Sequence, residues 1–448
     1  MTDVITMQAT DEEIIAELRV WLEENWDPEI TVGEWWERLG LAGWAAPSLP
    51  TTAFGRGVAR SVSVKIAQEI AQFGALSAPN GLGLLLAAPT IADHGTTEQI
   101  DTMVRAIVTG QRSWCQLFSE PGAGSDLAGL TTRAELDGDE WVINGQKVWT
   151  SLGQSADVGM LIARTDPDAP KHKGISYFAI DMHQDGVEVR PLTEMTGHAM
   201  FNETFLTDAR VPAAAMIGEK GNGWAVANST LAHERSGLGS GGGSAGSPTA
   251  IPGTVAGNLS KRVGDFVEAV DRTASPSAPA AGEPAPRKRR DRIFEILLGL
   301  AQGNGKATNG VVRQDLVRLF ILGELGRFNA ERSKAVRASG GDIAGMANIS
   351  KLSQSNIVRL QRDLGLGIVG PAGMLHAYEA SDNAAIVKAA ANPFLPAVTM
   401  TALYAQAPPI YGGTDQIQRN IISERALGLP KEPGSNNAVP FSQLPKNG

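Results

Sequence analysis

The sequence predicts an α+β protein in which a helical segment, a small β-domain and a second helical segment follow one another. Apolar residues recur at the spacing of an α-helix up to about residue 113, alternate with polar residues over about 114–215, and return to helical spacing from Ala225. Turn residues separate the alternating stretches, as is typical of small β-domains. We therefore expect three domains, which comprise residues 1–113, 114–215 and 216–448.

The composition is that of a globular protein and excludes several classes of function. The 448 residues are 42% hydrophobic and 19% charged, and the net charge of −9 argues against a nucleic acid or an anionic membrane as the main partner. No apolar run reaches the ~18–20 residues that a membrane span needs, and the N-terminal residues lack the basic and apolar regions of a secretory signal. We expect a cytoplasmic protein without a membrane span.

The usage of cysteine and histidine argues against a metal centre. Cys115 is the only cysteine of the sequence, which excludes an internal disulfide framework and a cysteine-based zinc site. The six histidines are scattered and form no pair with the spacing of metal ligands. We therefore expect no metal.

The helices of the N-terminal segment are marked by signals at their ends. Thr10 and Glu13 have the spacing of a capping box, and apolar residues then recur at helical spacing. The segments SVSVKIAQEIAQFG (61–74) and TEQIDTMVRAIVTG (97–110) each close with a glycine, the residue that commonly ends helices.

The central segment contains four stretches with the character of strands. The first, EWVINGQKVWTS (140–151), alternates around Asn144 and Gly145, a pair that predicts a type I′ hairpin turn. Further short strands are expected at VGMLIAR (158–164), ISYFAIDM (175–182) and GVEVRPL (186–192).

The third segment is helical but is interrupted by a long excursion. Residues 237–290 are rich in glycine, serine, proline and alanine, and we interpret them as mostly flexible, with one short helix within 258–270. The basic run RKRR in this excursion is interpreted as a solvated cluster; the alternative is a contact with a phosphate of CoA or of a nucleotide. Helical spacing is found in VVRQDLVRLFILGEL (311–325), SNIVRLQRDLG (355–365) and TDQIQRNIISERAL (414–427).

One motif carries most of the chemical information. SEPGAGSDLAGLTTRAE (119–135) is followed closely by GDEWVINGQKVWTSLG (138–153). The glycines permit a close approach of the backbone to a ligand and left-handed geometry, and Ser119 and Ser125 offer hydroxyl groups and backbone donors. Trp149 offers a flat face to an aromatic cofactor, with the Ser151 hydroxyl beside it. Trp141, which lacks such a position, is interpreted as a core residue.

The motif resembles that of the acyl-CoA dehydrogenase flavoprotein family. The resemblance covers nearly the whole chain outside the excursion and continues in order through LIARTD, VRPLTEMTGHAMFNETFLTDARVP, IGEKGNGWAVA, LAHERSG, GIVGPAGM and YGGTDQIQRNIISERALGLP. It implies an N-terminal helical domain, a central small β-barrel or sandwich domain and a C-terminal four-helix bundle. It also implies an enzyme that carries out FAD-dependent α,β-dehydrogenation of an acyl-CoA thioester, with an electron-transfer flavoprotein as electron acceptor.

The resemblance implies roles for particular side chains. Phe118 and Ser119 would line the flavin ring, and Ser125 would contact the pyrophosphate or the substrate. Trp149 and Ser151 would contact the ring and its N5 edge. The cofactor-binding residues implied in this way are Phe118, Ser119, Gly124, Ser125, Trp149, Ser151, Gly370, Gly373, Thr414 and Gln416, and the substrate-binding residues are Ser125, Arg235, Tyr411 and Gly412.

The reaction of the family needs a carboxylate that removes the α-proton while a hydride leaves the β-carbon for flavin N5. The family places its glutamate either after the tyrosine of the C-terminal turn, where this chain has Gly412, or on an earlier helix, where this chain has Glu234. We therefore interpret Glu234 as the base. The alternative is that Glu234 forms a structural ion pair or caps a helix. Asp415, the carboxylate nearest to Gly412, is expected to cap a helix or to interact with its dipole.

Two motifs with which the family serves the FAD of a neighbouring subunit are degraded. Arg-x-x-Phe-Gly is absent, and Arg313 and Gln314 occupy the matching helix start, while Gly367 stands where a loop glutamine is typical. The half-site for the chain's own FAD resembles the family. This pattern is similar to that of the α2β2 acyl-CoA dehydrogenases of actinobacteria that act on steroid-derived CoA thioesters. We expect a hetero-oligomer with a second acyl-CoA dehydrogenase-like chain, and otherwise a homotetramer.

Two other functions remain open at the level of the sequence. The chain could be a non-catalytic subunit, or one that supplies part of an FAD site, although Glu234 and SEPGAGSD argue against complete inactivity. It could also be a family flavoprotein that does not oxidise a Cα–Cβ bond, such as an oxidase, a monooxygenase or a desulfinase. The acyl group that is oxidised is not defined by the sequence.

Overall fold

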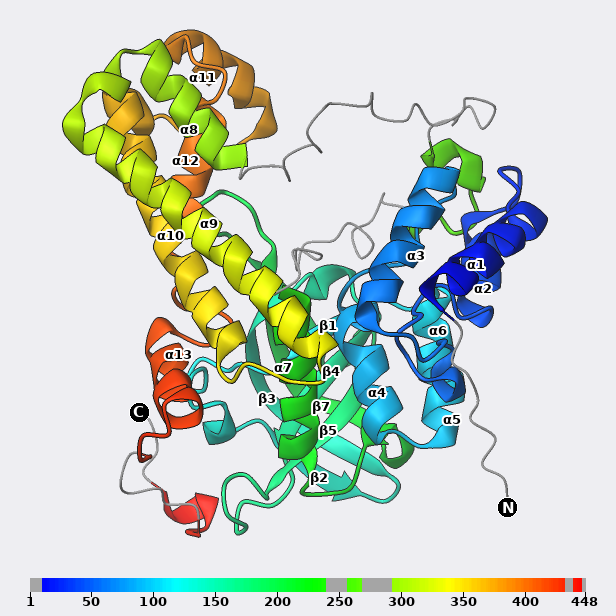
Figure 1. The fold of residues 1–448 in the computed structure, drawn as a ribbon. Helices are drawn as coiled ribbons and strands as arrows, with labels where there is room; N and C mark the ends of the chain where they lie inside the picture. The colour runs from blue at the N-terminus through cyan, green and yellow to red at the C-terminus, as the bar shows by residue number, and fades with distance from the viewer. Residues whose placement is uncertain (1–9, 239–255, 268–291, 432–437, 445–448) are drawn as a thin grey trace. The chain divides into compact units, whose positions relative to one another are not determined.

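The chain folds into two compact units (Figure 1). The computed structural model describes residues 10–238, 256–267, 292–431 and 438–444. Unit 1 comprises Met1–Leu192, Met200–Pro276 and Asn436–Gly448, and unit 2 comprises Thr193–Ala199 and Ser277–Ser435. Apart from Thr193–Ala199, which belong to unit 2, both of the expected N-terminal domains fall within unit 1. The boundaries at residues 113 and 215 therefore stay a prediction.

The helices of unit 1 begin and end at the signals in the sequence. The Thr10 hydroxyl accepts a hydrogen bond from the Glu13 N–H, and the Glu13 carboxylate accepts one from the Thr10 N–H, so the capping box is confirmed. Gly74 ends α3 with φ 81°. The helices are α1 (Asp11–Asn25), α2 (Val32–Leu41), α3 (Arg60–Phe73), α4 (Ala88–His94), α5 (Thr97–Gln99), α6 (Arg105–Val108) and α7 (Gly223–Leu238), with π-helical turns at Gly83–Ala87 and Ile100–Val104.

The strands of unit 1 form one mixed sheet. Its order is β6-β7-β3-β2-β4-β5-β8, and β1 pairs with β4 in parallel. The strands expected at 158–164, 175–182 and 186–192 are confirmed as β4, β5 and β6. The strands are β1 (Trp114–Leu117), β2 (Arg133–Asp137), β3 (Glu140–Ser151), β4 (Val158–Arg164), β5 (Ile175–Asp181), β6 (Val187–Leu192), β7 (Phe201–Pro212) and β8 (Met216–Ile217).

The hairpin turn predicted at Asn144 and Gly145 is wrong. Both residues lie inside β3, which pairs with β2 on one side and with β7 on the other. The tight turn lies instead between β2 and β3, where Asp137 pairs with Glu140 and Gly138 has φ 66°. At Gly145 the register against β7 shifts, which marks a bulge.

Two cores cover the two faces of the sheet. On β4, Met160 and Ile162 belong to the core that also contains residues from α1 to α7, whereas Leu161 and Ala163 belong to the core on the other face. Successive side chains of a strand point to opposite faces, so β4 is buried on both. Trp141 is buried in the second core, as expected.

Part of the predicted excursion packs against α2. Residues 256–267 form two 3₁₀ turns, Ala256–Asn258 and Val263–Phe266, and not the expected helix. The N–H of Val263 donates to the carbonyl of Ile30, and the N–H of Val32 donates to the carbonyl of Lys261. The rest of the excursion, including RKRR, lies outside the described residues.

Unit 2 is built from helices around α10. Leu297 of α8, Leu319 of α9, Leu364 of α10 and Val398 of α12 share one buried core, which is the expected four-helix bundle. The helices are α8 (Arg292–Gly303), α9 (Gly310–Ala338), α10 (Met346–Val369), α11 (Asn383–Ala390), α12 (Leu395–Tyr404) and α13 (Asp415–Ile421), followed by a π-helical turn at Ile422–Ala426.

Across the described ranges, no single helix has the length and apolar character to cross a membrane. Only α11 and α12 together meet these criteria, and they are bent by 111° at the break between them.

Candidate active site

The motif loop, residues 119–130, presents a short exposed turn. The N–H of Glu120 donates to the carbonyl of Ala123 and the N–H of Ala123 donates back, both at 3.0 Å. Gly122 and Gly124 are exposed, and a Cβ at either would meet nothing within 4 Å. Neither has a positive φ, so the left-handed geometry expected here is wrong. The backbone and the exposed Ser125 hydroxyl are therefore open to a ligand.

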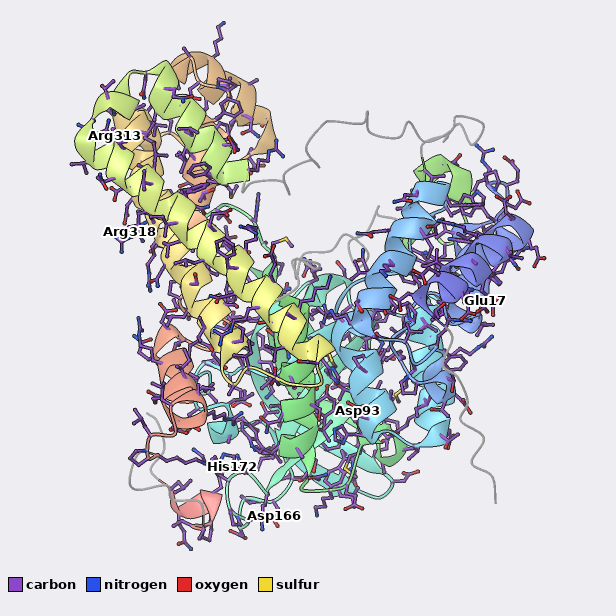
Figure 2. All side chains as sticks on the ribbon, viewed as in Figure 1. Glu17, Asp93, Asp166, His172, Arg313 and Arg318 are labelled. Carbon is purple, nitrogen blue, oxygen red and sulfur yellow. The ribbon has the colours of Figure 1, made fainter. Side chains whose placement is uncertain are left out.

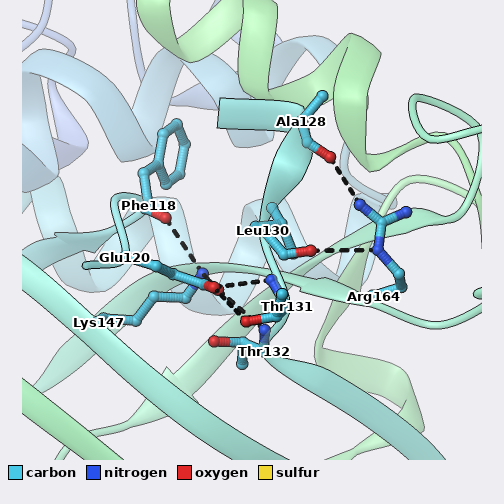
Figure 3. A network of polar contacts seen from close by, with 8 residues as sticks. All are labelled: Phe118, Glu120, Ala128, Leu130, Thr131, Thr132, Lys147 and Arg164. Carbon is cyan, nitrogen blue, oxygen red and sulfur yellow. Dashed lines mark hydrogen bonds and ion pairs between the residues drawn. The ribbon is translucent and has the colours of Figure 1, made fainter. Parts of the chain in front are cut away.

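A buried ion pair between Glu120 and Lys147 supports the start of this loop from the protein interior (Figure 3). The Glu120 carboxylate accepts hydrogen bonds from Lys147 Nζ at 2.8 Å, from the N–H and hydroxyl of Thr131 at 2.7 and 2.9 Å, and from the N–H of Thr132 at 3.0 Å. Lys147 Nζ also donates to the carbonyl of Phe118 at 3.1 Å. The Lys147 side chain is 0% exposed.

The two charges of this pair respond differently to burial. Burial alone would raise the pKa of Glu120, but the Lys147 ammonium and the hydrogen bonds from Lys147, Thr132 and Thr131 lower this pKa to about 2. Burial lowers the pKa of Lys147, and the Glu120 carboxylate opposes that effect. Four donors on one carboxylate keep Glu120 ionised, and an ionised Glu120 holds the start of the loop.

Arg164 supports the end of the loop (Figure 3). Its guanidinium donates to the carbonyl oxygens of Leu130 at 3.2 Å, Ala128 at 2.7 Å and Lys171 at 3.0 Å. Burial lowers the pKa of Arg164 to about 10, which leaves it charged at neutral pH. The roles of Glu120, Lys147 and Arg164 were not predicted from the sequence. For Glu120 and Lys147 a signal was present, because each stands inside one of the two quoted motif segments.

Trp149 is held in an uncommon conformation. Its φ is 63°, and the register of β3 against β7 shifts between Lys147 and Thr150. A bulge of this kind re-aims a side chain, and Trp149 is 58% exposed although it is large and apolar. Its ring meets the edge of Phe201 at a centroid distance of 5.9 Å. Backbone strain that presents an aromatic ring to solvent is common at ligand sites.

Glu234 lies on the buried stripe of α7. Over residues 223–234, the part of this helix whose side chains the structure describes, the buried positions are Gly223, Val226, Ala227 and Thr230, and the residue at 234 continues them at the period of 3.6 residues. The exposed positions lie on the opposite face. Glu234 itself is half-buried.

A chain of contacts joins α7 to Phe118. The ring of Phe118 meets that of Tyr177 edge-on at a centroid distance of 5.9 Å. The Tyr177 hydroxyl lies 3.3 Å from the hydroxyl of Thr230, one helical turn before Glu234. Two residues that the sequence analysis assigned to the site, Phe118 and Glu234, are thus linked through one tyrosine and one threonine.

Polar contacts with α4 orient α7. The hydroxyls of Thr90 and Thr230 lie 3.0 Å apart, and His233 Nε2 lies 3.0 Å from Oδ2 of Asp93, which Figure 2 labels. The two contacts lie three residues apart on each helix, just under one helical turn, and together they fix the rotation of α7 about its axis. Arg235 belongs to α7, and its side chain lies outside the described part of the chain.

The C-terminal turn is held by Gln418. The side-chain amide of Gln418 donates to the carbonyl oxygens of Gly412 at 2.8 Å and Gly413 at 3.2 Å. Both glycines have positive φ, 61° and 84°. A Cβ at Gly412 would meet only Lys351 Cε, at 4.0 Å, whereas one at Gly413 would lie 2.7 Å from the Gln418 nitrogen. The Tyr411 hydroxyl lies 2.5 Å from that of Tyr404.

The start of α13 excludes one of the two roles expected for Asp415, that of a helix cap, whereas its place in the first turn agrees with the other, an interaction with the helix dipole. Thr414 is the N-cap, because its hydroxyl accepts from the N–H of Ile417, so Asp415 does not cap the helix. Asp415 lies in the first turn, is buried, and is paired with Arg359 Nη2 at 2.8 Å. Gln416 is exposed.

The remaining predicted glycines have roles within unit 2 itself. Gly370 ends α10 with φ 64°, beside the Lys306 ammonium, which donates to the carbonyl oxygens of Gly367 and Ile368. A Cβ at Gly373 would lie 2.9 Å from the side chain of Leu366. Among the residues that the structure describes, no group of three or more His, Cys, Asp or Glu side chains could hold a metal ion.

Comparison with known proteins defines the class of protein. Residues 6–111 match the family model for the acyl-CoA dehydrogenase N-terminal domain, and residues 115–209 match that for the middle domain. The chain is 33% identical over 438 residues to the acyl-CoA dehydrogenase IpdE1 of Mycobacterium tuberculosis, which covers 94% of this chain and 98% of that relative. The chain therefore belongs to the acyl-CoA dehydrogenase family.

Solved structures share the fold. The structure named Tcur3481-Tcur3483 steroid ACAD is similar with a TM-score of 0.64 and 25% identity, covering 96% of this chain and 100% of that chain. A chain of the ChsE4-ChsE5 complex from Mycobacterium tuberculosis is similar with a TM-score of 0.59 and 25% identity, again covering 96% and 100%.

The predictions of family, fold and enzyme class are thus confirmed. The chain is an acyl-CoA dehydrogenase, an oxidoreductase of a flavoprotein family. The roles of the individual site residues stay predictions.

Proposed function

We propose that this chain catalyses the α,β-dehydrogenation of an acyl-CoA thioester with FAD as cofactor and Glu234 as the base. The observation that carries the proposal is the position of Glu234 on the buried stripe of α7, joined through Thr230 and Tyr177 to Phe118. A glutamate that formed only a surface ion pair would be expected on the opposite, exposed face of the helix. This position supports catalysis over that alternative.

The residues of unit 1 fit a flavin. The exposed Trp149 ring offers an aromatic contact, and the exposed Ser125 hydroxyl offers a polar one. The space above the glycines of the motif loop is free, so a flavin could approach without rearrangement of the core. Phe118, Ser119 and Ser151 would complete the contacts with the ring. FAD, when bound there, supplies the acceptor for the hydride that leaves the substrate β-carbon.

Glu234 would take the α-proton of the thioester onto its carboxylate. A base that removes a proton from carbon works best where it is partly buried, away from bulk water. The half-buried position on α7 supplies part of that burial, and closure of the site by substrate would supply more. Tyr411 and Gly412 are proposed as substrate contacts of unit 2, and Arg235 as a residue that orients the substrate.

The Glu234→Gln variant tests the base. We expect kcat to fall by about 10²- to 10⁴-fold while flavin content and acyl-CoA binding are retained, because the amide keeps the shape but cannot accept the proton. Glu219→Gln, which changes an exposed glutamate just before α7, is the matched control and should have the activity of the unchanged protein. Turnover of Glu234→Gln at the rate of the control would exclude this base.

The substrate is proposed to be a bulky acyl-CoA, such as a steroid-derived thioester. The support is that one structural neighbour is named a steroid ACAD. As electron acceptor we propose an electron-transfer flavoprotein. A screen of straight-chain, branched and steroid CoA thioesters tests the class. Oxygen consumption without an added acceptor would instead favour an oxidase, and a flavin that no thioester reduces would favour a non-catalytic subunit.

The active form is proposed to be a hetero-oligomer with a second acyl-CoA dehydrogenase-like chain. Two observations support this proposal. The first is that the names of both structural neighbours contain two chain names. The second is an apolar stripe on α9, whose residues are each 41–54% exposed. The stripe consists of Val317, Phe320, Ile321, Leu325 and Phe328. Helix faces of this kind are typical of subunit interfaces.

Co-expression with a second acyl-CoA dehydrogenase-like chain of the same organism tests the assembly. We expect a complex with the mass of two copies of each chain and with fewer flavins than chains. The double variant Phe320→Ser/Phe328→Ser should not form this complex. Leu136→Ser, which changes an exposed apolar residue of β2, is the control. A homotetramer of this chain with one FAD per chain would contradict the proposal.

A further inference from the structure

Residues 438–444, the C-terminal segment (red in Figure 1), pack on the loop that follows β4. The N–H groups of Phe441 and Ser442 donate to the carbonyl oxygens of Ala169 and Pro167, at 3.0 and 2.8 Å. Backbone bonds of this kind set the register of the C-terminal segment, because they do not depend on the side chains.

This register places the Phe441 ring over Arg164. The guanidinium carbon lies 3.5 Å from the centroid of the ring. One N–H group on each guanidinium nitrogen of Arg164 donates to a backbone carbonyl, of Leu130, Lys171 or Ala128, and N–H groups of a guanidinium lie in its plane. Its flat face is then left for the aromatic ring, which attracts a desolvated cation.

The same loop is tied to the motif loop, residues 119–130, at a second point. Lys171 Nζ lies 2.7 Å from each oxygen of Asp126, within the motif loop. The next residue, His172, packs against Trp224 of α7 with ring centroids 4.9 Å apart. The loop after β4 thus contacts the motif loop, α7 and the C-terminal segment.

We propose that Phe441 is a positioning residue of the flavin-binding motif loop, and that it acts through Arg164. The C-terminal segment fixes the Phe441 ring, the ring fixes the plane of the guanidinium, and the guanidinium holds the carbonyl oxygens of Ala128 and Leu130. This inference rests on the proposed function of the motif loop in binding FAD. The role proposed for Phe441 is to hold Arg164, and not to contact the substrate or the flavin.

The test compares two substitutions at one position. Phe441→Leu keeps an apolar side chain but removes the aromatic face, and Phe441→Trp keeps the face. Titration of the flavin-free protein with FAD should give a Kd raised by roughly three- to thirtyfold in Phe441→Leu and restored in Phe441→Trp. Ser442→Ala removes only a side-chain hydrogen bond, to Asp168 at 3.0 Å, and is the control for general loosening of the C-terminal segment.

Hydrogen exchange of the flavin-free protein provides a readout that does not depend on FAD. We expect faster exchange at the N–H groups of Thr131 and Thr132 in Phe441→Leu, because the adjoining loop loses its support. Unchanged exchange would overturn the inference, and so would faster exchange with an unchanged Kd for FAD. An unmodified protein that binds no FAD would contradict the proposed function, while exchange would still decide whether Phe441 positions the loop.

Discussion

Replacement of Lys147 by methionine should destabilise unit 1 far more than the loss of a surface charge does. The change leaves the Glu120 carboxylate buried with three hydrogen-bond donors but without its counter-charge. Breaking a buried pair in this way typically costs about 3–5 kcal/mol. Among the effects that lower the pKa of Glu120 against its burial, the Lys147 ammonium is the largest, so Lys147→Met removes the main stabilisation of this buried charge.

Thermal unfolding followed by circular dichroism measures the effect. For a unit of this size, a loss of about 3–5 kcal/mol lowers Tm by roughly 10 °C. Lys65→Met, which breaks an exposed ion pair with Asp11, is the control and should cost less than about 1 kcal/mol. The double variant Lys147→Met/Glu120→Gln should recover part of the loss, because neither charge of the pair is then left buried without its partner. A Lys147→Met protein that melts like the control would refute the reasoning.

The pH dependence follows from the same pair. The pKa of Glu120 is lower in the folded protein than in the unfolded chain, so the unfolded chain binds a proton first as the pH falls. The stabilisation is therefore complete above about pH 4.5 and is lost as the pH falls toward about 2. The difference in Tm between the unmodified protein and the double variant should shrink over this window, and a difference that stays constant would contradict the assignment.

Four further substitutions test local geometry. Trp149→Gly should cost less than about 2 kcal/mol, because its φ of 63° suits glycine, yet it should weaken retention of flavin on gel filtration. Gly145→Ala should lower stability by about 1–3 kcal/mol in chemical denaturation, since a Cβ would lie 2.4 Å from the Thr132 hydroxyl oxygen. Gly413→Ala should lower Tm more than Gly412→Ala, because only at Gly413 would a Cβ meet an atom at 2.7 Å; equal losses would contradict this.

The order of helices and strands could be predicted because it depends on local patterns. The capping box at Thr10 and the glycine that ends α3 are decided by contacts within one turn of helix. Asn144 and Gly145 show the limit of such signals. The dipeptide favours a turn wherever it stands, but here strands on both sides bind it, and the Asp-Gly pair at 137–138 makes the turn instead.

The site could be predicted only as far as a resemblance to known motifs reached. Phe118 and Glu234 were expected in one site, and the contacts through Tyr177 and Thr230 agree with this. The support beneath the motif loop could not be found by periodicity, because Glu120 and Lys147 stand 27 residues apart. Charged residues are rarely buried, so sequence patterns assign them to the surface.

The placement of charge in unit 1 argues that its motif loop is shaped for a ligand and not for stability. Glu120, Lys147 and Arg164 are all buried, and all three hold the same loop. A well-packed apolar cluster of similar volume is often as stable as a buried ion pair or more so. What the charges add is direction: Lys147 and Arg164 donate to backbone carbonyl oxygens at the start and the end of the loop, while the space above Gly122 and Gly124 stays open. A loop that must present its backbone to a cofactor needs such support, because its glycines supply no side chains to anchor it.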